Sequence, residues 1–151
     1  MKKTAIIIGF GGMGKRYFKS LNNLNFKIIA ICEKNLNNVQ KDIKNKFYFI
    51  NNYKKLLSKK ADLLCVVTNT DTRYKILIDF LKKGKIKRII TEKPLSTSID
   101  QGNRLLELTK KKKIKLSVNN HRSLSPNYLN IKKFIEKKKE KVTHMFINSP
   151  S

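Results

Sequence analysis

With 151 residues, of which 40% are hydrophobic, the chain is long enough for one domain with a buried core, and its composition excludes a disordered protein. No apolar run reaches the roughly 18 residues that a membrane-spanning helix needs, so we expect no membrane partner. The 35 basic and 10 acidic residues give a formal net charge of +25, which raises the question of a polyanionic partner.

The excess charge is carried by lysine, with 30 lysines and 5 arginines. Lysine, isoleucine and asparagine make up 64 of the 151 residues, and all three have A/T-rich codons, so the base composition of the gene explains much of the excess. A basic surface also fits a nucleic-acid-binding protein, but such proteins favour arginine, and no helix-turn-helix, zinc-ligand set or aromatic RNA-binding stretch accompanies the lysines. We expect non-specific polyanion binding at low salt, no specific nucleic acid and no metal.

The first residues predict a β-strand rather than a signal peptide. Two lysines and an apolar run open the chain, but the run soon gives way to glycines and then to Lys15 and Arg16, without a small-residue cleavage site. Cys32 and Cys65 each lie in an apolar, strand-like run outside any CxxC pair, which is typical of small buried side chains in a reducing compartment. We therefore expect a cytoplasmic protein.

Strand-like and helical stretches alternate along the first half of the chain. The predicted strands are TAIIIG (4–9), KIIAIC (27–32), FYFI (47–50) and DLLCVVT (62–68). The fourth is apolar throughout, as in a strand covered on both faces of a parallel sheet. The stretches between them predict helices over about 12–24, 36–46 and 51–60.

The second half continues the alternation. Its predicted helices lie within 72–85, where Gly84 is a plausible C-terminal cap, and over 98–113 and about 127–139. Its predicted strands are IKRIIT (86–91), IKLSV (114–118) and KVTHMFIN (141–148). Repeated β-α units with apolar strands predict an α/β fold, a Rossmann-like doubly wound parallel sheet with right-handed crossovers. An apolar last strand without a neighbour would favour dimerisation, so a homo-oligomer is also expected.

Three glycines in a GxGxxG frame follow the first predicted strand and open the first helix. In a dinucleotide fold, Gly9 would make the tight turn, Gly11 would let the pyrophosphate approach the backbone, and Gly14 would allow close packing of helix on strand. The phosphates then lie at the positive N-terminus of the helix. The other interpretation is a plain glycine turn in an α/β protein.

Glu33 favours the dinucleotide interpretation. It stands 19 residues after Gly14, directly behind the second predicted strand, where a carboxylate can hold the adenosine ribose. A carboxylate accepts hydrogen bonds from both ribose hydroxyls and repels a 2'-phosphate, which favours NAD over NADP. The neighbouring Lys34 could pair with a phosphate, so NADP stays open.

Four segments together resemble the glucose-fructose oxidoreductase / inositol dehydrogenase (Gfo/Idh/MocA) family. They are IIIGFGGMGKRYF (6–18), IIAICEKN (28–35), ADLLCVVTNTDTRY (61–74) and IITEKPLS (89–96), and they occur in the order and at the spacing of that family. EKP is the most specific part, and the resemblance extends over about residues 3–122. It implies an NAD(P)-binding Rossmann domain over 1–122, and a linking helix with the first strand of an otherwise missing substrate domain over 123–151.

The resemblance implies a role for nine residues of the nucleotide domain. Those that would contact the cofactor are Gly9, Gly11, the Met13 backbone, Gly14, Glu33, Thr68, Asn69 and Glu92, the last on the nicotinamide-side ribose. Lys93 would be catalytic, hydrogen-bonding the substrate hydroxyl and assisting its proton transfer during hydride transfer. The parent reaction would oxidise a hydroxyl of a sugar, polyol or sugar nucleotide.

The chain also departs from the family pattern. Arg73 stands where relatives often have a histidine, which puts a cofactor-stacking role there in doubt and suggests a helix cap instead. His121 could approach the substrate, His144 is expected to be structural, and the usual catalytic histidine would fall beyond Ser151. We therefore expect cofactor binding without efficient turnover by these residues alone, the alternative being a non-catalytic nucleotide-binding module.

Overall fold

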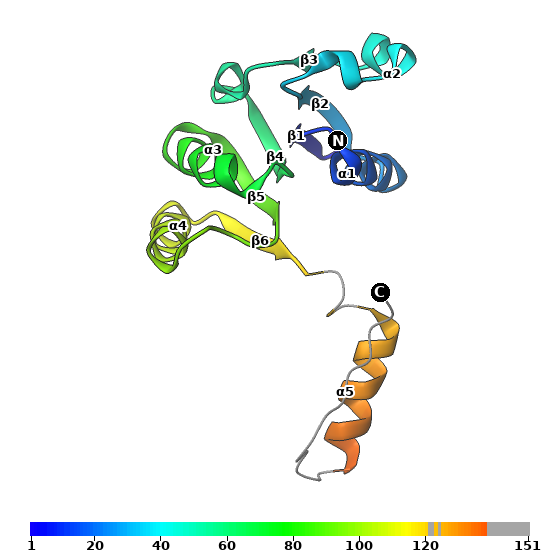
Figure 1. Cartoon of the computed structure of the whole chain (residues 1–151), viewed down its shortest axis with the longest axis vertical. Helices are drawn as coiled ribbons and strands as arrows, with labels where there is room; N and C mark the ends of the chain where they lie inside the picture. Colours follow the sequence, from blue (N-terminus) through cyan, green and yellow to red (C-terminus); the bar gives the residue numbers. More distant parts are fainter. Residues whose placement is uncertain (121–122, 124, 139–151) are drawn as a thin grey trace. The chain divides into compact units, whose positions relative to one another are not determined.

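The structure is a computed structural model that describes residues 1–120, 123 and 125–138. The chain divides into two compact units, Met1–Asn119 and Asn120–Ser151. The first unit is a six-stranded sheet with the order β3-β2-β1-β4-β5-β6, and every pair of neighbouring strands is parallel (Figure 1). Its strands are β1 (Thr4–Ile8), β2 (Lys27–Cys32), β3 (Phe49–Ile50), β4 (Lys60–Val66), β5 (Lys85–Glu92) and β6 (Lys115–Asn119).

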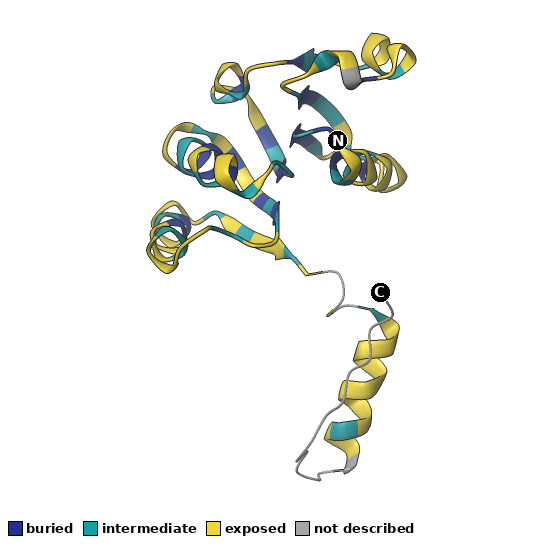
Figure 2. Ribbon diagram, viewed as in Figure 1, coloured by how far each residue is buried: buried dark blue, intermediate teal, exposed yellow. Residues whose placement is uncertain are grey.

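Helices lie on both faces of this sheet, as a doubly wound fold requires. They are α1 (Gly12–Asn23), α2 (Lys41–Lys46), α3 (Thr70–Lys83) and α4 (Ile99–Lys112), with two short 3-10 helices, η1 (Leu36–Asn38) and η2 (Tyr53–Leu56). One buried cluster joins the strands to α3 and α4, and another joins them to α1. Figure 2 shows the buried residues concentrated in the strands and on the helix sides that face them. The predicted Rossmann-like sheet is confirmed.

Two predicted helices differ from the structure. The stretch 36–46 is divided into η1 and α2, because Val39 between them is extended and only 6% exposed, packed into the cluster on the α1 face. Burial of that one apolar side chain outweighs continued helical hydrogen bonding in a polar stretch. Residues 51–59 form only the 3-10 turn η2, and Lys60 already begins β4. At η2 the Asn52 side chain accepts a hydrogen bond from Lys54 N at 3.0 Å, and Leu56 is fully buried.

Both cysteines are free and buried in the core. Burial raises the pKa of the Cys32 thiol to about 11, with the Glu33 charge as a smaller cause, and raises that of Cys65 to about 12. They therefore serve as small buried side chains, as their sequence context predicts. No helix among the described residues is long and apolar enough to span a membrane.

The second unit contains α5 (Pro126–Lys138). Apolar side chains on this helix are exposed, with Tyr128 at 47%, Leu129 at 40% and Ile131 at 54%. The predicted last strand, 141–148, lies outside the described residues, as do His121 and His144.

The turn from β1 into α1 is packed so closely that Gly9 and Gly14 leave no room for a Cβ atom. Gly9 has φ +95° and donates its N–H to the Cys32 carbonyl at 2.8 Å. A Cβ on Gly9 would stand 2.7 Å from the Val67 carbonyl oxygen, and one on Gly14 would stand 2.2 Å from the Gly9 carbonyl oxygen. The backbone of α1 therefore rests directly on the end of β1 and beside the end of β4.

This contact predicts opposite outcomes for two glycines of α1. Gly14→Ala should lower the free energy of unfolding by about 3 kcal/mol, because the added methyl group overlaps backbone atoms that cannot move independently. Gly12→Ala should be neutral or stabilising by up to about 1 kcal/mol, because nothing lies within 4 Å of its Cβ position and alanine favours the helix. Urea unfolding followed by circular dichroism measures both, and equal effects would contradict the packing described here.

Two adjacent leucines of α4 provide a similar comparison. Leu105 is fully buried and Leu106 is 47% exposed. Leu105→Ala should cost about 3 kcal/mol of unfolding free energy, because it leaves a cavity against the sheet, whereas Leu106→Ala should cost less than about 1 kcal/mol. The same urea titration measures the difference, and comparable losses at the two positions would show that α4 does not pack through this face.

Candidate functional site

The strand order reverses at β1, which has β2 on one side and β4 on the other. In open α/β sheets ligands bind outside the carboxyl ends of the strands at such a switch point. Every predicted site residue that the structure describes lies at this edge, in the turns after β1, β2, β4 and β5, in the first turn of α1 or at the end of β5. The sheet therefore brings together residues that lie up to 84 positions apart, from Gly9 to Lys93.

The N-terminus of α1 is open to a ligand. Gly11 is the N-cap residue and so provides no side-chain cap, and the first turn holds no acidic residue. Nothing lies within 4 Å of the position of a Gly11 Cβ. Because the first N–H groups of a helix lack intrahelical partners and carry partial positive charge, this end suits an anion.

Glu33 is half-buried directly beside this turn. Its Oε2 accepts a hydrogen bond from Phe10 N at 2.7 Å and its Oε1 accepts one from Asn35 N at 3.1 Å. The carboxylate thus braces the glycine turn from the end of β2. Each oxygen keeps a second lone pair, so the same carboxylate can also accept hydrogen bonds from hydroxyl groups of a ligand.

Thr68 and Asn69 connect β4 to α3 at the same edge. The Thr68 hydroxyl is buried without a hydrogen-bond partner among the residues that the structure describes, and Asn69 is the N-cap residue of α3 but makes no side-chain cap bond. Buried polar atoms normally find a partner, so an unsatisfied hydroxyl at this edge is a candidate ligand contact.

Glu92 ends β5, and two side chains from other elements hold its carboxylate. Its Oε1 accepts hydrogen bonds from Tyr17 Oη of α1 at 2.9 Å and from Asn119 Nδ2 of β6 at 2.7 Å. Burial, followed by the hydrogen bond to Glu92 and its charge, raises the pKa of Tyr17 well above its usual value. Tyr17 therefore remains a hydrogen-bond donor, and the predicted site residue Glu92 is tied to the helix that the glycine turn opens.

Lys93 follows immediately, and its side chain is exposed at the carboxyl edge of β5. The Lys93–Pro94 peptide bond is cis. The structure thus places Lys93 next to Glu92, at the same edge of the sheet as the glycine turn. The other predicted site residue, His121, lies outside the described residues.

Arg73 does not have the helix-capping role that its position in the sequence suggests. It does not cap the start of α3 but is 3% exposed, and its guanidinium donates hydrogen bonds to the main-chain oxygens of Thr68, Glu92 and Pro94. A signal for this burial was present in the sequence, because Arg73 shares the helical face of Ile76, Leu77 and Phe80 at the i, i+3, i+4, i+7 spacing.

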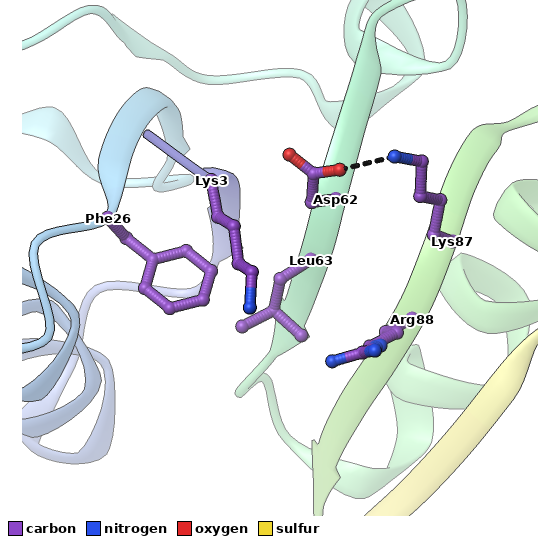
Figure 3. A pocket seen from close by; sticks show the side chains of 6 residues that line it. All are labelled: Lys3, Phe26, Asp62, Leu63, Lys87 and Arg88. Atoms are coloured by element: carbon purple, nitrogen blue, oxygen red, sulfur yellow. Dashed lines mark hydrogen bonds and ion pairs between the residues drawn. The ribbon is translucent and has the colours of Figure 1, made fainter. Parts of the chain in front are cut away.

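A cavity of about 210 Å³ lies at a different place, near the amino ends of the strands (Figure 3). Asp62 in its wall accepts hydrogen bonds from Lys87 Nζ at 2.7 Å, Thr4 N at 2.9 Å and Thr4 Oγ1 at 3.0 Å. Lys87 first, and then Thr4, hold the pKa of Asp62 far below its usual value. These contacts join the starts of β1, β4 and β5, so Asp62 is structural. Within the described residues, no group of His, Cys, Asp and Glu side chains is arranged to hold a metal ion.

Comparisons with known proteins agree with this geometry. A family model described as an oxidoreductase family with an NAD-binding Rossmann fold matches residues 3–120. The chain is similar to the solved myo-inositol 2-dehydrogenase from Lactobacillus plantarum, with 20% identity and a TM-score of 0.80 over 92% of this chain and 42% of that one. It is also similar to the WlbA dehydrogenase from Chromobacterium violaceum in complex with NADH and UDP-GlcNAcA, with 18% identity and a TM-score of 0.81 over 91% and 40% of the two chains.

A third solved structure, scyllo-inositol dehydrogenase from Lactobacillus casei, has 16% identity and a TM-score of 0.78 over 91% of this chain and 42% of that one. No curated protein matches the chain. At these identities the structural likeness shows the fold, and the chain spans about two fifths of the length of each of these three structures. Because the family model covers most of the chain, from the first strand through the last strand of the sheet, the chain belongs to the Gfo/Idh/MocA oxidoreductase family, whose hallmark is an NAD-binding Rossmann fold.

Proposed function

We propose that residues 1–122 bind NAD across the carboxyl edge of the sheet, as the nucleotide domain of an oxidoreductase. The observation that carries the proposal is the open, glycine-capped N-terminus of α1 with the Glu33 carboxylate bound to the same turn. The pyrophosphate would lie against the backbone of the glycine turn, including Met13, where the N–H groups are free of a cap and the helix dipole is positive.

Glu33 would hold the adenosine ribose. Its two oxygens each have one lone pair left after the bonds to Phe10 and Asn35, which matches the two hydroxyls of a ribose. A 2'-phosphate would place a second negative charge beside this carboxylate. The preference should therefore be for NAD over NADP.

Thr68, Asn69, Glu92 and Lys93 would surround the nicotinamide half. The Thr68 hydroxyl has no hydrogen-bond partner among the described residues, and the Asn69 side chain makes no cap bond to α3, so both can contact the cofactor. Glu92 is held in place for the nearby ribose. The bound nicotinamide supplies the hydride acceptor or donor. Lys93, exposed beside it, would hydrogen-bond the substrate hydroxyl and take its proton at Nζ.

The substrate would be a sugar, polyol or sugar nucleotide, and the whole protein would hold it with a second domain. We propose that residues 123–151 begin that domain, with α5 as the linking helix, because the matched structures are more than twice as long. Its apolar side chains Tyr128, Leu129 and Ile131 are exposed, as expected of a helix that packs on a larger structure. His121 could approach the substrate. The free cysteines fit a reducing compartment such as the cytoplasm.

Titration with NADH, followed by the fluorescence of the reduced nicotinamide, tests the cofactor proposal. Glu33→Gln should weaken NADH binding by about tenfold, because the amide keeps only one acceptor oxygen. It should also reduce the ratio of NADH affinity to NADPH affinity, because the amide is uncharged and no longer repels a 2'-phosphate. Glu107→Gln is the matched control, since Glu107 is an exposed glutamate on α4 and its loss changes the net charge equally.

The titration should be done at moderate salt, because a net charge of +25 attracts any polyanion when charges are unscreened. Saturable NADH binding that Glu33→Gln weakens and Glu107→Gln leaves unchanged would support the proposal. Equal, salt-sensitive binding of NADH, NADPH and inorganic pyrophosphate would refute it and would leave the glycines as a structural turn.

A further inference from the structure

Arg73 occupies a position that is unfavourable for a positive charge. It is 3% exposed and lies in the first turn of α3, where the helix dipole is itself positive. Burial lowers the pKa of its guanidinium, and the charge of Glu92 opposes this only partly. Its Nε is buried without a partner among the described residues. A buried charge with these costs adds little to stability. The hydrogen bonds that Arg73 makes therefore call for a reason other than stability.

Two of the three hydrogen bonds that the Arg73 side chain makes to described residues are to the backbone around Lys93, and the third is to the turn after β4. The Arg73 Nη1 donates to the Glu92 carbonyl oxygen at 2.9 Å and also to the Pro94 carbonyl oxygen, so one nitrogen bridges the residues on either side of Lys93. The Nη2 donates to the Thr68 carbonyl oxygen at 2.6 Å. The guanidinium therefore fastens the segment that follows β5 to the end of β4.

The geometry of an arginine side chain suits this set of contacts. The planar guanidinium presents its N–H groups in a fixed fork, so two nitrogens can bind three carbonyl groups at defined angles. A lysine at the same position would bring the charge as a single point on a flexible stem. The substitution Arg73→Lys therefore separates the fork from the charge.

Glu92, the residue before Lys93, is fixed at both of its ends. Arg73 binds its main-chain oxygen, while Tyr17 and Asn119 bind its carboxylate. Three elements, α1, α3 and β6, thus converge on the residue that precedes the exposed lysine. Because the backbone on both sides of Lys93 is held, the direction in which its side chain leaves the sheet is restricted.

We propose that Arg73 is a positioning residue, which fixes the backbone on both sides of Lys93 and so shapes the nicotinamide half of the site without contacting the cofactor. The inference rests on the proposed function for the role of Lys93 and of the cofactor. Because Arg73 bonds to the turns after β4 and β5 and to none of the glycines, its loss should affect one half of the dinucleotide site only.

The experiment compares NADH with ADP, which contains the adenosine and pyrophosphate part alone. Arg73→Lys should weaken NADH binding by about tenfold, the effect of losing a charge-assisted hydrogen bond, and leave ADP binding unchanged within about twofold. Arg88→Lys is the matched control, because Arg88 is exposed on the same strand β5 and should alter neither affinity. A general loss of structure would weaken NADH and ADP together, and that outcome would overturn the proposal.

A second measurement uses the backbone amide resonances of Lys93 and Leu95, without any cofactor. Arg73→Ala should shift or broaden both, and guanidinium chloride well below its unfolding concentration should restore them, whereas sodium chloride at equal ionic strength should not. Unchanged resonances, or equal recovery with sodium chloride, would overturn the inference. If Arg73→Ala does not fold, the Arg73 guanidinium resonances of the unmodified protein should move on adding NADH but not ADP, and their indifference to both would overturn it.

The two proposals can fail separately. If the unmodified protein binds neither NADH nor ADP, the proposed function fails, while the amide resonances still report whether Arg73 positions Lys93. If NADH binds and Arg73→Lys weakens NADH and ADP equally, the cofactor proposal stands and the positioning role fails.

Discussion

The contact between Gly14 and the carbonyl of Gly9 is the constraint on which the rest of the site depends. The first turn of α1 can approach β1 this closely only because neither residue carries a Cβ at the point of contact. The approach aims the free N–H groups of α1 at the carboxyl edge, where the strand order reverses. It also places Tyr17, one turn further along α1, within hydrogen-bond distance of Glu92. A glycine turn thereby helps to set the geometry of Glu92, which lies 75 positions after Tyr17 in the chain.

Two acidic residues at the carboxyl edge, Glu33 and Glu92, are each bound by backbone or side-chain donors. The chain has only 10 acidic residues, and two of them, Glu33 and Glu92, stand at this edge. Glu33 is bound by two backbone N–H groups and Glu92 by Tyr17 and Asn119, so both carboxylates are held in defined positions. Held in this way, they can direct hydroxyl groups of a ligand.

Six of the 35 basic residues have a structural place away from this edge. Lys82 and Lys83 lie in the last turn of α3, and three lysines, 110–112, lie in the last turn of α4, where they complement the helix dipole. Lys87 pairs with Asp62 near the amino ends of β1 and β4. For these residues, the positive charge has a structural explanation that does not involve the candidate site.

The sequence alone determined the order of strands and helices, the glycine turn, the acidic residue after β2 and the EKP segment, because hydrophobic periodicity and glycine positions are local signals. It could not divide the stretch 36–46, because the burial of Val39 depends on the cluster on the α1 face. It could not give the partners of Glu92 either, because Tyr17 and Asn119 come from other elements.

Arg73 shows most clearly what the sequence determines and what only the tertiary structure decides. Its spacing with Ile76, Leu77 and Phe80 is that of a buried helix face, but the role expected from the sequence is a helix cap. Nothing in the sequence says what would receive a buried guanidinium. Only the parallel pairing of β4 with β5 brings the Thr68, Glu92 and Pro94 carbonyl groups around one side chain. Local pattern decided which residues form the strands, and the packing of strands on one another decided which polar groups meet at their ends.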